Sequence, residues 1–158
     1  MQDQFVTVET RIAGVTFDNP DGTSRQALAR LLVPGDPLLL VREPMNPFDQ
    51  NAIALQARDG KAGGRKLGFL PRALAAVLAP VVDAGLIVEG RVVRVQKIPR
   101  HGLWTPPVWG VRIELNGLLS SLALPVRTGL EPALIRACRE DEDEMGDAPA
   151  LGGLRSRP

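Results

Sequence analysis

Alternating apolar and polar positions form the first clear pattern, and they begin near the start of the chain. Within residues 5–14, one face carries Val6, Val8 and Ile12, and polar residues alternate with them. A period of two is typical of a strand that is buried on one side. Similar short runs predict further strands at residues 38–42, 51–57, 66–70, 86–98 and 109–115.

Two segments have the spacing of amphipathic helices. Ser24 is a helix-capping residue type and precedes a helix predicted over residues 25–32. A second helix begins at Pro71, because proline suits a first helical turn. Its apolar face is formed by Leu74, Val77, Leu78, Val81 and Val82. Pro80 lies within this run, so we expect it to kink the helix or end it early, and Gly85 is a natural stop.

The C-terminal part of the chain has a weaker pattern. Leu130, Leu134 and Ala137 predict a short helix over residues 130–139, and the polar segment from Glu140 onwards is expected to be disordered. We therefore predict one domain over residues 1–118 and a C-terminal extension over residues 119–158. The order of elements predicts a mainly β fold with short helices, in the α+β class, with about six strands in a small barrel or strongly curved sheet and two helices between them.

Size and composition suit this prediction. The chain has 158 residues, of which 44% are hydrophobic, enough for one domain with a real core. No run approaches the roughly 18 apolar residues of a membrane span. The first residues, Met1 to Gln4, lack the basic start and apolar run of a secretory signal. Cys138 is the single cysteine, which excludes a disulfide within the chain and favours a cytoplasmic location.

The net charge of +1 hides an uneven distribution. Between Arg58 and Lys97 there are eight basic and three acidic residues, whereas residues 140–144 are five consecutive acids. A basic middle of this kind is compatible with a face that binds phosphates. An ordinary solvated surface with an acidic tail explains it equally well.

The residue types needed for catalysis or metal binding do not cluster. His101 and Cys138 are the only histidine and cysteine, and alone they cannot form a metal site. The sequence has no nucleophile elbow, and the glycine-rich residues 60–68 fit no phosphate-binding motif. We therefore expect neither enzyme activity nor a metal or cofactor.

One motif is specific enough to identify a family. Residues 42–53 read Arg-Glu-Pro-Met-Asn-Pro-Phe-Asp-Gln-Asn-Ala-Ile, and after a hairpin residues 67–72 read Leu-Gly-Phe-Leu-Pro-Arg. In this order and spacing, the stretch from Phe5 to Ile98 resembles the HIRAN domain. The resemblance implies a compact, OB-like barrel that captures the free 3′ end of single-stranded DNA. No helicase region is recognised in this chain, so any fork remodelling would depend on a helicase or nuclease supplied by a partner.

The resemblance also implies which residues form the site. Two aromatic rings enclose the terminal base, an asparagine and an acid lie near the 3′-hydroxyl, and basic or polar groups lie near the neighbouring phosphate. At the matching positions stand Phe17, Asn46, Phe48, Asp49, Phe69 and Arg72. This chain departs from the family pattern in having Thr16 at a basic position and Phe69 at the place of a polar ring. The departures put the affinity for phosphate in doubt.

General physical chemistry supports this assignment. A base stacked on an aromatic ring gains about 1–3 kcal/mol regardless of sequence. A second negative charge ~4 Å from Asp49 would cost about 4 kcal/mol at an effective dielectric of 20, which disfavours an internal phosphate relative to a terminal hydroxyl. Arg72 lies in the first turn of a predicted helix, where backbone N–H groups also favour an anion.

Other interpretations stay open at this point. Residues 46–49 can be a simple turn in which Asp49 caps local N–H groups and Phe48 packs into the core. Trp104 and Trp109 fit packing roles better than base platforms. The chain can also be a protein-interaction adaptor that uses the barrel groove or the acidic tail, or a module that binds RNA.

Overall fold

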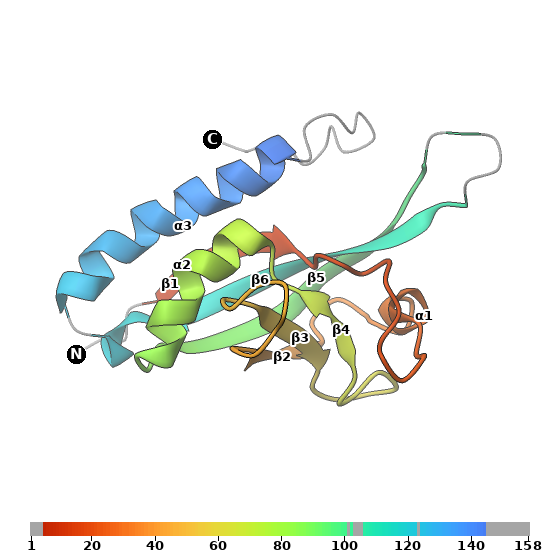
Figure 1. The fold of residues 1–158 in the computed structure, drawn as a ribbon, viewed down its shortest axis with the longest axis horizontal. Helices are drawn as coiled ribbons and strands as arrows, with labels where there is room; N and C mark the ends of the chain where they lie inside the picture. Colours follow the sequence, from red (N-terminus) through yellow and green to blue (C-terminus); the bar gives the residue numbers. More distant parts are fainter. Residues whose placement is uncertain (1–4, 101, 103–105, 123, 145–158) are drawn as a thin grey trace.

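A computed structural model of the chain describes residues 5–100, 102, 106–122 and 124–144. Its strands form one antiparallel sheet in the order β1-β6-β5-β2-β3-β4. The strands are β1 (Phe5–Arg11), β2 (Pro37–Arg42), β3 (Ile53–Ala57), β4 (Lys66–Phe69), β5 (Ile87–Ile98) and β6 (Val108–Leu118). The sheet curls into a half-barrel, and the long β5–β6 hairpin projects beyond it past α1 (Arg25–Ala29) (Figure 1).

A single bridge joins the two edges of this curled sheet. Ala13, just after β1, exchanges two backbone hydrogen bonds with Phe69 at the end of β4, with N···O distances of 2.7 and 2.9 Å. Gly68 makes this close approach possible. Its φ is +153°, and a Cβ atom there would clash with the carbonyl oxygen of Ala13 and lie 2.6 Å from Cγ2 of Ile12. Only glycine fits where two backbones meet so closely.

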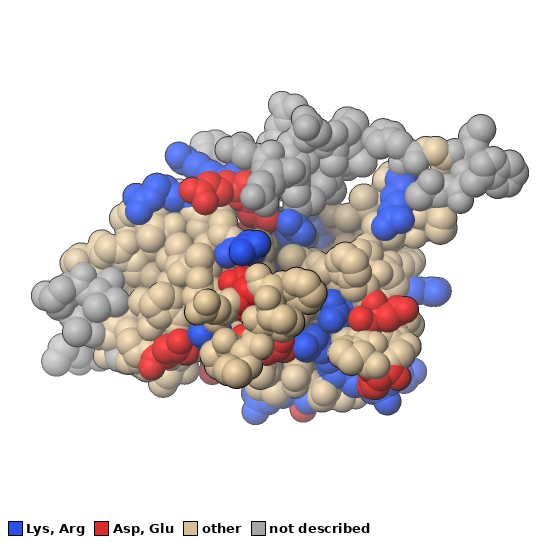
Figure 2. Space-filling model, viewed as in Figure 1, with Lys and Arg blue, Asp and Glu red and all other residues tan. Residues whose placement is uncertain are grey.

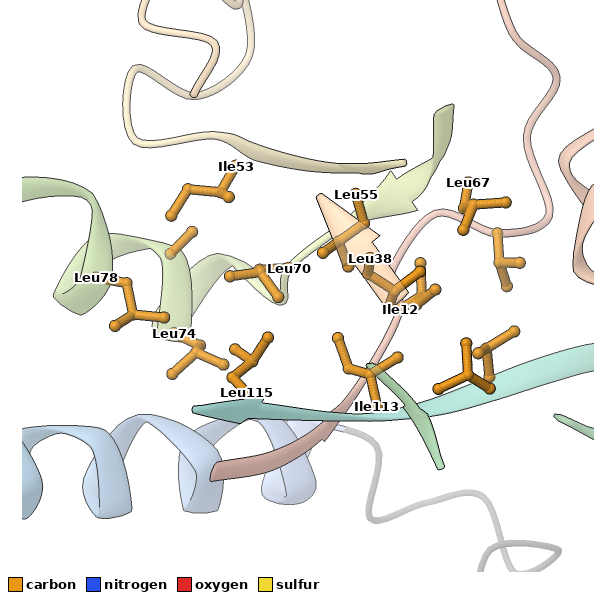
Figure 3. Close-up of a cluster of buried hydrophobic side chains, with 14 of the residues drawn as sticks. Ile12, Leu38, Ile53, Leu55, Leu67, Leu70, Leu74, Leu78, Ile113 and Leu115 are labelled. Carbon is orange, nitrogen blue, oxygen red and sulfur yellow. The ribbon is translucent and has the colours of Figure 1, made fainter. Parts of the chain in front are cut away.

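The core lies inside the half-barrel, beneath α2 (Arg72–Asp83). Figure 3 shows side chains from α2, β3, β4 and β6 pointing into one shared space. The fully buried members include Ile53, Leu55, Leu67, Leu74 and Ile113. Burying each such side chain contributes about 1.5–3 kcal/mol, so this cluster fixes the frame on which the loops are mounted.

The third helix, α3 (Leu124–Glu144), packs against α2 and β1 (Figure 1). Its buried side chains are Leu130, Leu134, Ala137 and Asp141. The carboxylate of Asp141 accepts two hydrogen bonds from Arg11, with distances of 2.6 Å from Nη2 and 3.0 Å from Nε. This ion pair fastens the acidic end of the helix to β1.

The predicted fold class is confirmed: the protein is mainly β, with six strands in a curled half-barrel and short helices. Several boundaries differ from the predictions, most clearly those of the three helices. The first helix ends at Ala29 rather than residue 32. The second runs through Pro80 to Asp83, because the missing N–H falls in its last turn and only one helical bond is lost. The third extends beyond residues 130–139 in both directions, and residues 140–144 are helical rather than disordered, because Arg11 binds Asp141.

The division at residue 118 stays a prediction, and the expected disorder of residues 145–158 lies outside the described residues. Among the described helices, none has both the length and the apolar character needed to cross a membrane.

Candidate functional site

The predicted site residues lie on three connections of the half-barrel. Phe17 is in the loop between β1 and α1. Asn46, Phe48 and Asp49 are in the β2–β3 loop (residues 43–52). Phe69 ends β4, and Arg72 begins α2 three residues after the closing bridge.

The β2–β3 loop holds its shape through hydrogen bonds of its own. Oδ1 of Asn46 accepts from the backbone N–H groups of Phe48 and Asp49, at 2.9 and 3.2 Å. Nδ2 of Asn46 donates to Glu43 at 3.1 Å. Oδ1 of Asp49 accepts from the N–H of Asn51 at 2.9 Å. Asn46 therefore shapes the loop, a role that the prediction of a hydroxyl contact did not include, and Asp49 keeps its second oxygen for another donor.

The aromatic rings of the two loops face solvent. Phe17 is 68% exposed and Phe48 is 86% exposed. The alternative in which Phe48 packs into the core is therefore wrong, although Asp49 does accept from a local N–H as that alternative expected. Met45, three residues before Phe48, is 91% exposed, so the tip of the loop is apolar. Exposed rings on turns with fixed backbones are available for stacking.

Phe69 lies close to Phe17 and between two cations. A Cβ atom at Gly14 would lie 3.7 Å from the Phe17 ring and 3.8 Å from the Phe69 ring, so both rings flank the same point of the backbone. The guanidinium of Arg25 is 5.4 Å from the centroid of the Phe69 ring, and Nζ of Lys66 is 4.9 Å from it. Cations at such distances are attracted to the face of an aromatic ring.

Arg25 ties the β1–α1 loop to the sheet. It is 7% exposed; its Nε donates to Asn19 at 2.8 Å and its Nη1 donates to the carbonyl of Gly14 at 3.0 Å. Asn19 in turn donates to the carbonyl of Lys66 in β4 at 2.9 Å. The backbone that carries Phe17 is thereby held against β4.

Glu43 connects this arrangement to the β2–β3 loop. Its carboxylate accepts from Nζ of Lys66 at 2.6 Å and from the Asn46 amide at 3.1 Å. Burial alone would raise the pKa of Glu43, but the hydrogen bonds from Lys66 and Asn46 and the nearby Arg25 charge hold it below its usual value. Burial lowers the pKa of Arg25, and the charges of Glu43 and Asp18 oppose that shift. A chain of charged groups thus links both aromatic loops.

Arg25, Glu43 and Lys66 were not among the predicted site residues. Glu43 belongs to the Arg-Glu-Pro motif, which is the one signal in the sequence that could have pointed to it. Nothing local marks Arg25, because it reaches Phe69 only after the sheet has curled; Lys66 lies on the same strand as Phe69 but belongs to no motif that marks it. Figure 2 shows Lys and Arg side chains gathered beside the β2–β3 loop on the side toward α1, with acidic side chains among them.

Arg72 is exposed in the first turn of α2, a helix of 12 residues. Within the part of the chain that the structure describes, neither the side chain of Arg72 nor the ring of Phe48 takes part in a hydrogen bond, ion pair or ring contact, so both are free to meet a ligand. No group of three or more metal-ligating side chains occurs among the described residues. This arrangement of exposed rings, a carboxylate and cations is suited to binding a ligand.

Comparisons with known proteins agree with this architecture. The chain matches the HIRAN domain family over residues 6–103. The HIRAN domain of human HLTF superposes with a TM-score of 0.51 at 19% identity, covering 83% of this chain and 88% of that one. An NMR structure of the HLTF HIRAN domain gives a TM-score of 0.49 at 19% identity, with 85% and 91% covered. A protein from Lactobacillus plantarum gives 0.47 at 21% identity, with 72% and 98% covered. No curated protein sequence matches the chain.

Proposed function

Because the chain belongs to the HIRAN domain family, we propose that it is a non-catalytic module that binds single-stranded DNA, with a preference for a free 3′ end. Family membership supports the DNA-binding part of this proposal. A role in DNA repair or replication-fork processing, with a helicase or nuclease acting in trans, and a cytoplasmic location belong to the same proposal.

One observation carries the proposal: two exposed phenylalanine rings lie on loops that one network of polar side-chain contacts connects. Phe17 is held through Gly14 and Arg25, and Phe48 through Asn46 and Glu43, with Lys66 between them. Pre-ordered loops lose little conformational entropy when a base stacks on their rings. Each stacked base gains about 1–3 kcal/mol without regard to its identity.

Asp49 and the basic groups complete the proposed site. The free oxygen of Asp49 accepts from a terminal hydroxyl and repels an internal phosphate, which gives the preference for an end. Arg72 at the first turn of α2 attracts the phosphate that precedes the terminal nucleotide. Lys66 and Arg25 also lie beside Phe69, but Lys66 is paired with Glu43 and Arg25 is buried, so Arg72 supplies the proposed phosphate contact.

Alanine substitution of the two rings tests the proposal. Phe17→Ala and Phe48→Ala should each weaken binding of a short single strand by about tenfold, the loss of about 1.4 kcal/mol of stacking. Fluorescence anisotropy at low salt measures it. Phe5→Ala is the matched control, because Phe5 is 60% exposed at the opposite end of β1. Equal losses in all three variants, or no binding by the wild-type protein, would refute the proposal.

A second function, a protein-interaction adaptor, is favoured by Met45 together with Phe48. Two exposed apolar side chains on one loop resemble the anchors that fill a partner's pocket. Met45→Ala separates the functions: it should leave DNA affinity within about twofold if stacking dominates, and abolish capture of a protein partner if the adaptor function holds.

A further inference from the structure

Three arginines stand in one row across the outer face of the sheet. Arg11 of β1 pairs directly with Arg112 of β6, and Arg112 pairs directly with Arg94 of β5. Partners in register project on the same side of a sheet. The side is the outer one, because Val111 and Ile113, the neighbours of Arg112 along β6, point into the core.

A bulge in β5 creates this row. The register shifts between Val92 and Arg94, so Val93 is left without a partner across the ladder. Without the extra residue, Arg94 would not stand opposite Arg112. A bulge that re-aims a side chain costs pairing energy and commonly marks a position with a function.

The positive charge of the row is only partly neutralised. Asp141 binds Arg11 through two hydrogen bonds. Glu9 lies 3.4 Å from Nε of Arg112, a long contact from a half-exposed carboxylate. Arg94 is exposed and has no ion-pair partner among the described residues. Like charges directly opposite on neighbouring strands are destabilising, so this row is suited to an added anion.

A cavity adjoins the row. Its volume is about 90 Å³, and its walls include Arg11, Arg112, Gln96, Ile98, Val108 and Val15. Gly110 forms part of the lining with no side chain of its own. Two arginines and an amide in the wall of a largely apolar cavity can provide both phosphate contacts and a surface for a sugar or base.

We propose that Arg94, Arg112 and Gln96 form a second nucleic-acid contact, which binds a backbone phosphate of the strand away from its 3′ end. The inference rests on the proposed function, and the two sites adjoin. Val15, which lines the cavity, is two residues from Phe17, a separation of at most about 7 Å along the chain. The cavity therefore comes close to the loop that carries Phe17, within reach of a strand bound there.

The length dependence of DNA binding tests this inference. Oligothymidylates of about four and about sixteen nucleotides, with free 3′ ends, distinguish a contact with the strand end alone from a contact that continues along the strand. Arg94→Glu should weaken binding of the long strand by about threefold to tenfold and reduce the steepness of its salt dependence by about 0.7, while affinity for the short strand stays within about twofold. Arg94→Ala should show a smaller loss of the same kind.

Arg139→Glu is the control, because Arg139 is exposed on α3 and the substitution changes the net charge equally. Equal losses from Arg94→Glu and Arg139→Glu, or equal wild-type affinity for both lengths, would overturn the inference and leave the proposed function intact. Length-dependent binding that Arg94→Glu weakens but a blocked 3′ end does not affect would support the row and refute end recognition. Absence of all binding would overturn both.

Discussion

Gly68 shows how one residue allows the half-barrel to close. Its φ of +153° and the absence of a Cβ atom let β4 approach Ala13 closely enough for two backbone hydrogen bonds. The bridge places Phe69 beside the loop that carries Phe17. The conformation of this glycine therefore determines the geometry of the candidate site as well as that of the sheet.

Replacement of Gly68 should destabilise the protein, both because of its φ and because of the close approach of Ala13. Gly68→Ala should lower the free energy of unfolding by about 3 kcal/mol or more, because the added methyl group meets the backbone of Ala13. Urea unfolding measures the effect. Gly64→Ala is the control: its φ is +76° and no heavy atom lies within 4 Å of an added Cβ, so only the backbone strain of about 1–2 kcal/mol is expected. Equal losses of stability for the two variants would contradict this prediction, because they would show that the structure relaxes to remove the clash.

Glu43 should make the stability of the protein depend on pH. Hydrogen bonds from Lys66 and Asn46 lower its pKa, so its contribution to stability is present above the ordinary glutamate value of about 4.3 and is lost as the pH falls through the lowered pKa. The advantage of the wild-type protein over Glu43→Gln in urea unfolding should therefore be largest near about pH 6 and shrink toward about pH 3. Glu89→Gln, at an exposed position in β5, controls for the loss of one negative charge. An advantage that stays constant over this range would contradict the role of Glu43.

Individual residues of the candidate site were predictable where they belong to a sequence motif. The Arg-Glu-Pro-x-Asn-Pro-Phe-Asp motif identified the β2–β3 loop, and its ring at Phe48 is exposed as a base-stacking role requires. The bonds of Asn46 join residues only two or three positions apart; the sequence predicted a turn here but gave its capping role to Asp49. The position of Arg25 over Phe69 was not predictable, because it depends on the distance between segments that are far apart in the sequence, and such a distance has no local signal.

At the scale of elements, periodicity located each of the strands and the helix beneath which the core lies, but it was weakest for α3. The face of Leu130, Leu134 and Ala137 was predicted and is buried. Its acidic end was expected to be disordered, because a polar, highly charged segment has little apolar surface to bury. Packing on α2 and the ion pair with Arg11 order it instead, and neither is visible in the local sequence.

The ion pair between α3 and β1 is directly testable. Asp141→Asn should lower the free energy of unfolding by about 1–3 kcal/mol, because Arg11 loses a nearly buried carboxylate. Hydrogen exchange in the last turns of α3 should become faster. Glu140→Gln, at the exposed neighbouring position, should change neither quantity measurably. Similar behaviour of the two variants would mean that the acidic end is held by packing alone.

At the scale of the whole molecule, the half-barrel is a rigid support for exposed loops. Its edges meet at Ala13 and Phe69, and from this junction extend the Phe17 loop and the start of α2. The β2–β3 loop is fastened to the same region through Glu43 and Lys66. The fold thus carries exposed rings, a carboxylate and cations on connected loops, an arrangement that suits binding of a single strand.

The comparison of two ends of the same strand tests this account most directly. Fluorescence anisotropy with a short single strand that carries either a free 3′-hydroxyl or a 3′-phosphate measures whether the terminal hydroxyl is recognised. We predict that the phosphorylated strand binds at least about tenfold more weakly, because its added charge lies near Asp49. Equal affinity for the two strands would contradict recognition of the end, even if the protein binds DNA.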